Sequence, residues 1–123
     1  MKASPLVGDV FTDDCPGREI VEHITSRWAP LIVAALRGGS LRFFELRETL
    51  DGISEKVLSQ KLRVLVRDGL IERTVEPSVP PKVSYELTKL GHGLSEPLQQ
   101  LVNWIGAHGE EVVAAQQEHD KAS

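Results

Sequence analysis

Basic residues crowd one short segment of a chain that is acidic overall. The segment "SEKVLSQKLRVLVRD" holds Lys56, Lys61, Arg63 and Arg67, whereas the 123-residue chain has a formal net charge of −4. Residues 1–36 carry three cations and five anions, residues 37–89 ten and eight, and residues 90–123 one and five. Ammonium and guanidinium groups bind phosphate oxygens, and guanidinium also pairs with guanine edges. The middle of the chain therefore suits an anionic partner, although the chain as a whole does not.

The same segment predicts an amphipathic helix whose polar side is basic. Ser54 suits the N-cap position, and Asp68-Gly69 suits the C-terminal end. At about 100° per residue, Leu58, Leu62 and Leu65 share one side of the helix. The opposite side carries Lys56, Ser59, Gln60, Arg63 and Arg67. Such a face offers donors and acceptors to a nucleic acid, but it also occurs on ordinary solvated helices.

Three shorter helices are predicted before this one. The first begins at Pro16, with Cys15 as its N-cap. Ser26 is expected to cap the second, in "SRWAPLIVAALRGG", and "RFFELRETL" forms the third. The spacing predicts that the second buries Trp28, Leu31, Ile32, Ala35 and Leu36, and that the third turns Phe43, Leu46, Leu50 and Phe44 inward.

After Gly69 the period changes to that of β-strands. "LIERTV" and "KVSYEL" alternate apolar and polar residues, and "EPSVPPK" between them favours a stiff hairpin tip. Thr88 then caps a long final helix. Two helices joined by a short turn and followed by a hairpin indicate a winged helix-turn-helix. We expect an α+β, mainly α fold with additional N- and C-terminal dimerisation helices: a loose arm at 1–14, the domain at 15–108 and a fraying polar tail at 109–123.

The sequence resembles the HxlR-type family of bacterial transcriptional regulators. The matching strings are "CPGREIVEHITSRWAPLIVAAL", "LRFFELRETLDGISEKVLSQKLRVLVRDGLIERTV", "VPPKVSYELTKLG" and "LQQLVNWI", which cover most of the chain in the family's order. "SRWAP" departs from the family's usual Gly-Lys-Trp type start of that helix. The resemblance implies a homodimer that binds a pseudo-palindromic operator in double-stranded DNA with the basic helix and regulates transcription, which we expect to be repression, although the sequence does not distinguish a repressor from an activator. No apolar run has membrane-spanning length and the N-terminus does not resemble a secretory signal, so a cytoplasmic protein is expected.

These readings assign roles to particular residues. Arg63 and Gln60 are expected at bases, and Arg42 and Lys82 at phosphates. The full set expected to contact DNA is Ser54, Lys56, Ser59, Gln60, Arg63, Arg42 and Lys82. The apolar stripe of the final helix is expected to pack against its symmetry mate and the first helix through Leu94, Leu98, Leu101, Val102, Trp104 and Ile105.

Cys15 is the only cysteine, so an internal disulfide is excluded. An N-cap position and nearby Arg18 favour its thiolate, whereas Asp13 and Asp14 oppose it. The resemblance implies that some members sense electrophiles or oxidants through a cysteine in this position. Cys15 is therefore either a redox-sensing residue or only a helix cap.

Other classes of function have weaker support in the sequence. The four histidines are too far apart for a local zinc motif, so no metal or cofactor is expected. No glycine-rich phosphate loop and no catalytic constellation is present, so the chain is not expected to be an enzyme. Two alternatives stay open: a winged helix that binds proteins, or a sensor that holds an apolar ligand near Trp28, Phe43 and Trp104.

Overall fold

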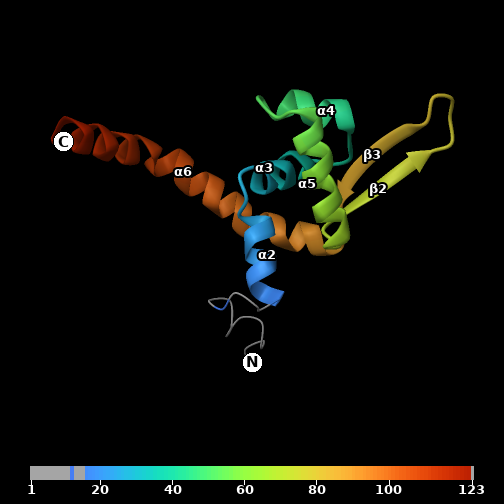
Figure 1. Cartoon of the computed structure of the whole chain (residues 1–123), viewed down its shortest axis with the longest axis horizontal. Coiled ribbons are helices and arrows are strands. Elements are labelled where there is room, and N and C mark those ends of the chain that lie inside the picture. The colour runs from blue at the N-terminus through green and yellow to red at the C-terminus, as the bar shows by residue number, and fades with distance from the viewer. Residues whose placement is uncertain (1–11, 13–15, 123) are drawn as a thin grey trace.

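The structure is a computed structural model that describes residue 12 and residues 16–122. Its elements follow the order of a winged helix with a long final helix (Figure 1). They are α2 (Pro16–Ile24), α3 (Ala29–Leu36), β1 (Leu41–Arg42), α4 (Phe43–Thr49), α5 (Glu55–Arg67), β2 (Ile71–Glu76), β3 (Lys82–Leu87) and α6 (Lys89–Ala122). The predicted α+β, mainly α winged helix-turn-helix is confirmed.

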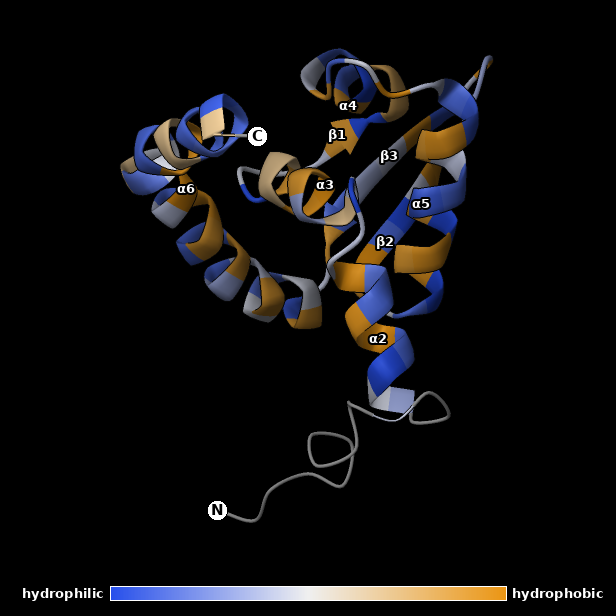
Figure 2. Ribbon diagram, turned by 60° about the vertical axis from the view of Figure 1, so that its left-hand side comes forward, coloured by the Kyte–Doolittle hydropathy of each residue, from blue (hydrophilic) through white to orange (hydrophobic). Residues whose placement is uncertain are grey.

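The apolar helix α3 lies at the centre of the domain, with α2, α4, β3 and α6 packed around it (Figure 2). Ile32, Val33 and Leu36 of this helix are fully buried. Leu46, Leu58 and the other buried aliphatic side chains complete one core. Because the core is formed by aliphatic packing on a single central helix, helix α5 and the hairpin are held on one rigid support.

The hairpin belongs to a three-stranded antiparallel sheet in the order β1-β3-β2. β2 and β3 pair along their full lengths, from Ile71 opposite Leu87 to Glu76 opposite Lys82. The short strand β1 pairs with β3 through Leu41 and Tyr85. This third strand was not predicted, because two residues are too few to show a period of two. It ties the start of α4 to the base of the hairpin.

Three local predictions about α3 and α4 were wrong. Ser26 does not cap α3, since its hydroxyl donates to the carbonyl oxygen of His23 at 2.9 Å and the helix begins only at Ala29. Leu31 and Phe44 are exposed rather than buried. The buried side of α3 includes Ala29 and Val33 in addition to Trp28, Ile32 and Leu36.

Helix α6 is longer than the sequence suggested. Thr88 caps it as predicted, because the Gly91 N–H donates to Thr88 Oγ1 at 3.0 Å. The helix then continues through Ala122, so residues 109–122 are helical where a fraying tail was expected. Its C-terminal half projects away from the domain (Figure 1). Only its first turns contact α3 and β3 closely enough to be buried, at Gly91, Ser95 and Leu98.

Candidate DNA-binding surface

The two sides of α5 lie as the sequence predicted. Leu58, Leu62 and Leu65 are fully buried, whereas the positions between them are exposed or half-buried. Lys56, Gln60, Arg63 and Arg67 are exposed and Ser59 is half-buried. The apolar side fixes the helix on the core, so the polar side is presented as a rigid surface.

The N-terminus of α5 is shaped by Ser54. Its Oγ accepts a hydrogen bond from the Val57 N–H at 3.1 Å, which confirms the predicted cap. The hydroxyl proton is left to donate to another acceptor. Glu55 in the first turn accepts a hydrogen bond from Arg47 Nη1 of α4 at 3.1 Å. The turn between α4 and α5 is therefore held by one cap and one ion pair.

The C-terminus of α5 is closed by a glycine. Gly69 has φ +76°, in the left-handed region that favours glycine, and the Leu70 N–H donates to the Leu65 carbonyl oxygen at 3.0 Å. Asp68 at this end accepts a hydrogen bond from His23 Nδ1 of α2 at 2.7 Å. Arg67 Nη1 of α5 lies 3.8 Å from Glu19 Oε1, which also belongs to α2. The end of α5 is thus anchored to α2, a contact that no pattern in the sequence predicts.

Arg42 and Lys82 line one hollow beside the hairpin tip. The hollow has a volume of about 560 Å³ and is also lined by Phe43, Phe44 and Pro80. Both cations were expected at phosphates, and the fold brings them together from the start of α4 and the start of β3. Lys82 also lies opposite Glu76 in the strand register.

Several cations of this surface lack the carboxylate partner that other arginines of the chain have. Arg37 and Arg47 are each within salt-bridge distance of a carboxylate. Within the described part of the chain, no carboxylate lies that close to Lys56, Arg63, Arg42 or Lys82. Exposed cations without internal partners are available to an external anion.

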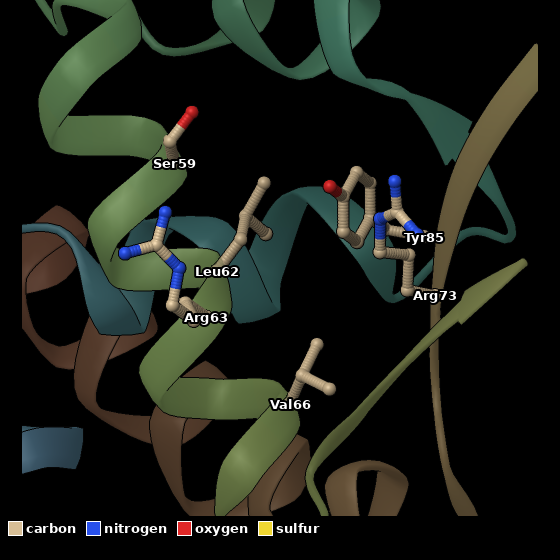
Figure 3. Close-up of a pocket in the computed structure, with 6 residues that line it drawn as sticks. All are labelled: Ser59, Leu62, Arg63, Val66, Arg73 and Tyr85. Atoms are coloured by element: carbon tan, nitrogen blue, oxygen red, sulfur yellow. The ribbon is translucent and has the colours of Figure 1, made fainter.

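Arg73 was missed by the sequence reasoning although it joins this surface. It lies on β2 directly opposite Tyr85 of β3, on the side of the hairpin that faces α5 (Figure 3). A hollow of about 370 Å³ separates the two elements and is lined by Ser59, Leu62, Arg63, Val66, Arg73 and Tyr85. The signal was present: Arg73 stands between Ile71 and Val75 where the strand period predicts an apolar residue.

The predicted dimer stripe divides into a covered and an uncovered part. Leu98 is 7% exposed and Leu94 packs against the core, so both are held within one subunit. Leu101, Trp104 and Ile105 are 48%, 52% and 53% exposed. Val102 lies half-buried beside them.

The cleft expected near Trp28, Phe43 and Trp104 is not the apolar hollow that the structure shows beside α6. Trp28 is buried and Trp104 is exposed. The apolar hollow lies between α2 and α6, has a volume of about 440 Å³ and is lined by Ile20, Ile24, Asp68, Leu70, Leu90, Gly93 and Leu94. Cys15 lies outside the described residues.

Comparison with known proteins agrees with this architecture. The model of the HxlR-like helix-turn-helix matches residues 23–113. The chain belongs to the HxlR-like helix-turn-helix family. It is 46% identical over 111 residues to the HTH-type transcriptional regulator YtfH of Escherichia coli (strain K12), covering 90% of this chain and 88% of YtfH.

Solved structures show the same likeness. The transcriptional regulator YtfH from Salmonella typhimurium has a TM-score of 0.82 and 44% identity, over 87% of this chain and 96% of that one. The redox regulator HypR in its reduced form has a TM-score of 0.75 and 29% identity, over 80% of this chain and 98% of HypR. This HxlR-family chain is therefore a transcriptional regulator with a DNA-binding helix-turn-helix fold.

Two further observations concern the described residues. None of their helices combines the length and apolar character needed to cross a membrane. Nor do they contain a group of three or more histidine, cysteine, aspartate or glutamate side chains that could hold a metal ion.

Proposed function

We propose that the protein binds specific operator sequences in double-stranded DNA as a homodimer and represses transcription there. The observation that carries this proposal is the exposed face of α5, on which Lys56 and Arg63 have no carboxylate partner among the described residues. A rigid helix with a free polar face, next to a hairpin, can enter the major groove while the hairpin contacts the adjacent backbone.

The roles of the side chains follow from their positions. Arg63 and Gln60 point outward near the middle of α5 and are proposed to contact base edges. Lys56, Ser59 and the free hydroxyl proton of Ser54 are proposed to contact the same groove and its phosphates. Arg42 and Lys82, across their shared hollow, are proposed to hold backbone phosphates.

The dimer proposal rests on the spacing of apolar residues along α6. Positions 94, 98, 101, 105, 108 and 112 follow steps of four, three, four, three and four, the seam of a coiled coil, and all of them are apolar except His108. The first two are covered by the subunit's own core, whereas Leu101, Ile105 and Val112 are exposed. A second copy is the partner that offers an identical stripe, so a symmetric contact between α6 helices would cover it.

DNA binding is tested by fluorescence anisotropy with a labelled fragment of the gene's own upstream region. Saturable binding that exceeds binding to random DNA and weakens steeply with added salt is expected. Arg63→Ala should weaken binding to the specific fragment and relax preference at one or two base positions. Lys82→Ala should weaken binding to all sequences alike and flatten the salt dependence. If both variants bind like the parent, the assignment of the face is wrong.

The dimer is tested by sedimentation equilibrium of two variants that add the same charge. Ile105→Asp places a carboxylate on the seam and should dissociate the dimer. Gln100→Asp adds the same charge away from the seam and should leave the mass unchanged. A parent protein that sediments as a monomer would contradict the proposal directly.

Regulation through Cys15 is proposed as a further element of the function. Its support is the family resemblance and the likeness to HypR, a redox regulator. Oxidation or alkylation at the start of α2 would act on DNA binding through the dimer helices. The test compares the parent with Cys15→Ser in the anisotropy assay, with and without a thiol oxidant. An equal response in both proteins would remove Cys15 from the mechanism.

A further inference from the structure

The hairpin distributes its charges between two faces. Side chains that alternate along a strand point to opposite faces, and directly paired residues share one. Glu72 lies opposite Glu86, so both carboxylates are on the face turned away from α5. Arg73 lies opposite Tyr85, which is 9% exposed and packs in the core. A cation is therefore directed toward α5, and the neighbouring anions are directed away from it.

The hollow between this face and α5 is lined by groups that can bind an anion. Ser59 and Arg63 border it from α5, and Arg73 and Tyr85 border it from the hairpin (Figure 3). None of its lining residues is acidic. Within the described part of the chain, neither guanidinium has an ion-pair partner. The hydroxyls of Ser59 and Tyr85 likewise have no hydrogen-bond partner among those residues.

This combination fits a tetrahedral oxyanion. The Arg73 guanidinium attracts an anion in the hollow, and the positive charge of Arg63 on the other side of the hollow adds to that attraction. Guanidinium presents paired N–H donors that match phosphate oxygens, and the two hydroxyls add further donors. Leu62 and Val66 supply apolar walls, which strengthen each charged contact by excluding water.

We propose that this hollow binds a phosphate group and that Arg73 is the principal residue that holds it. The source we assign is a phosphodiester of the DNA backbone, and this part of the proposal rests on the proposed function. With α5 in the major groove and the hairpin tip at the next groove, the DNA strand that separates the two grooves would pass the hollow between α5 and the hairpin. A phosphate fixed there would set the register in which Arg63 meets the bases.

The first arm of the test measures DNA affinity as a function of salt for Arg73→Ala. Loss of one charge-assisted phosphate contact should weaken binding about 10- to 100-fold, equally for specific and random DNA. The slope of log K against log salt should fall by about 0.9. Arg73→Lys should be intermediate, because it keeps the charge without the paired donors. Lys121→Ala, at the far end of α6, removes one cation away from the hollow and should change neither quantity.

The second arm uses inorganic phosphate without DNA. Phosphate should raise the thermal midpoint of the parent more than chloride at equal ionic strength, and this difference should disappear in Arg73→Ala. Tyr85→Phe, which removes only the hydroxyl, should reduce it.

The two arms separate the sources of the phosphate group and remain informative if the proposed function fails. An unchanged salt slope with a phosphate effect that depends on Arg73 would show a site for a free oxyanion and overturn the DNA assignment alone. If the parent does not bind DNA, the second arm still decides whether the hollow binds phosphate. If Arg73→Ala changes neither the salt slope nor the phosphate effect, the proposal is overturned.

Discussion

Gly91 should be one of the least replaceable residues of the chain. It lies in the first turn of α6, where this helix meets Leu70, in the segment between α5 and β2. A Cβ added at Gly91 would lie 2.0 Å from the Leu70 carbonyl oxygen and 3.2 Å from Leu87 Cδ2. Ordinary van der Waals contact begins near 3.4 Å, so the carbonyl or the helix must move by about 1.4 Å. The obstacle is backbone, which cannot rotate aside as a side chain can.

The cost of Gly91→Ala follows from what that movement breaks. The Leu70 carbonyl oxygen accepts a hydrogen bond from the Thr88 N–H at 3.1 Å, and its loss costs about 1 kcal/mol. Overpacking a tight contact costs about 1–3 kcal/mol, whereas alanine gains about 1 kcal/mol over glycine inside a helix. We expect a net destabilisation of about 1–3 kcal/mol.

The matched control is Gly106→Ala in the same helix. An added Cβ there meets nothing within 4 Å, so only the gain in helix propensity remains, at most about 1 kcal/mol. The free energy of unfolding is measured by urea denaturation followed by circular dichroism, at one protein concentration for all variants. Gly91→Ala should unfold at lower urea than the parent with an unchanged slope, and Gly106→Ala at equal or higher urea. A Gly91→Ala protein as stable as the parent would show that α6 does not sit against Leu70 in the way described.

Three further predictions use the same denaturation assay. In a double-mutant cycle, His23→Ala and Asp68→Ala should show a coupling of about 1 kcal/mol through their 2.7 Å hydrogen bond, and additive effects would mean that the bond does not form in solution. Leu65→Ala should cost about 2–5 kcal/mol, because the side chain is 1% exposed and leaves a cavity; a loss below 1 kcal/mol would place it outside the core. Ser54→Ala should cost about 0.5–2 kcal/mol through loss of the cap on Val57, whereas Ser54→Asp should retain most of the stability.

The strongest sequence signals came from elements whose pattern repeats. The leucines of α5 recur at helical spacing over several turns, so both its buried side and its polar side were predicted correctly. The alternation in "LIERTV" and "KVSYEL" located β2 and β3, although only Ile71, Tyr85 and Leu87 of these strands are buried. Ser54, Thr88 and Gly69 were assigned correctly as helix boundaries because capping depends on local backbone geometry, which nearby residues determine.

The predictions that failed concern two kinds of feature. Some are contacts between segments distant in the chain, and others are local hydrogen bonds for which one side chain has two possible partners. Ser26 has the side chain of an N-cap, yet its hydroxyl bonds backward to His23, and the two uses are similar in energy. The His23–Asp68 hydrogen bond joins residues that no periodicity relates. Arg73 was overlooked because it was treated as one polar residue in an alternating strand, although the alternation itself assigns it to the inner face.

The C-terminus of α5 is the point where the proposed dimer helices meet the proposed DNA-binding surface. Asp68 is held by His23 of α2, and the carbonyl oxygens of Gly69 and Leu70 accept hydrogen bonds from the capping residue of α6, Thr88. Helix α5 is thus fastened at one end to both elements expected to contact the partner subunit. A small rotation of the whole domain relative to a partner subunit would carry α5 with it, because the packed leucines of α5 hold it rigidly on the core. In the proposed dimer two half-sites about 34 Å apart would have to be met together, so such a rotation would change DNA affinity without altering any residue proposed to contact DNA.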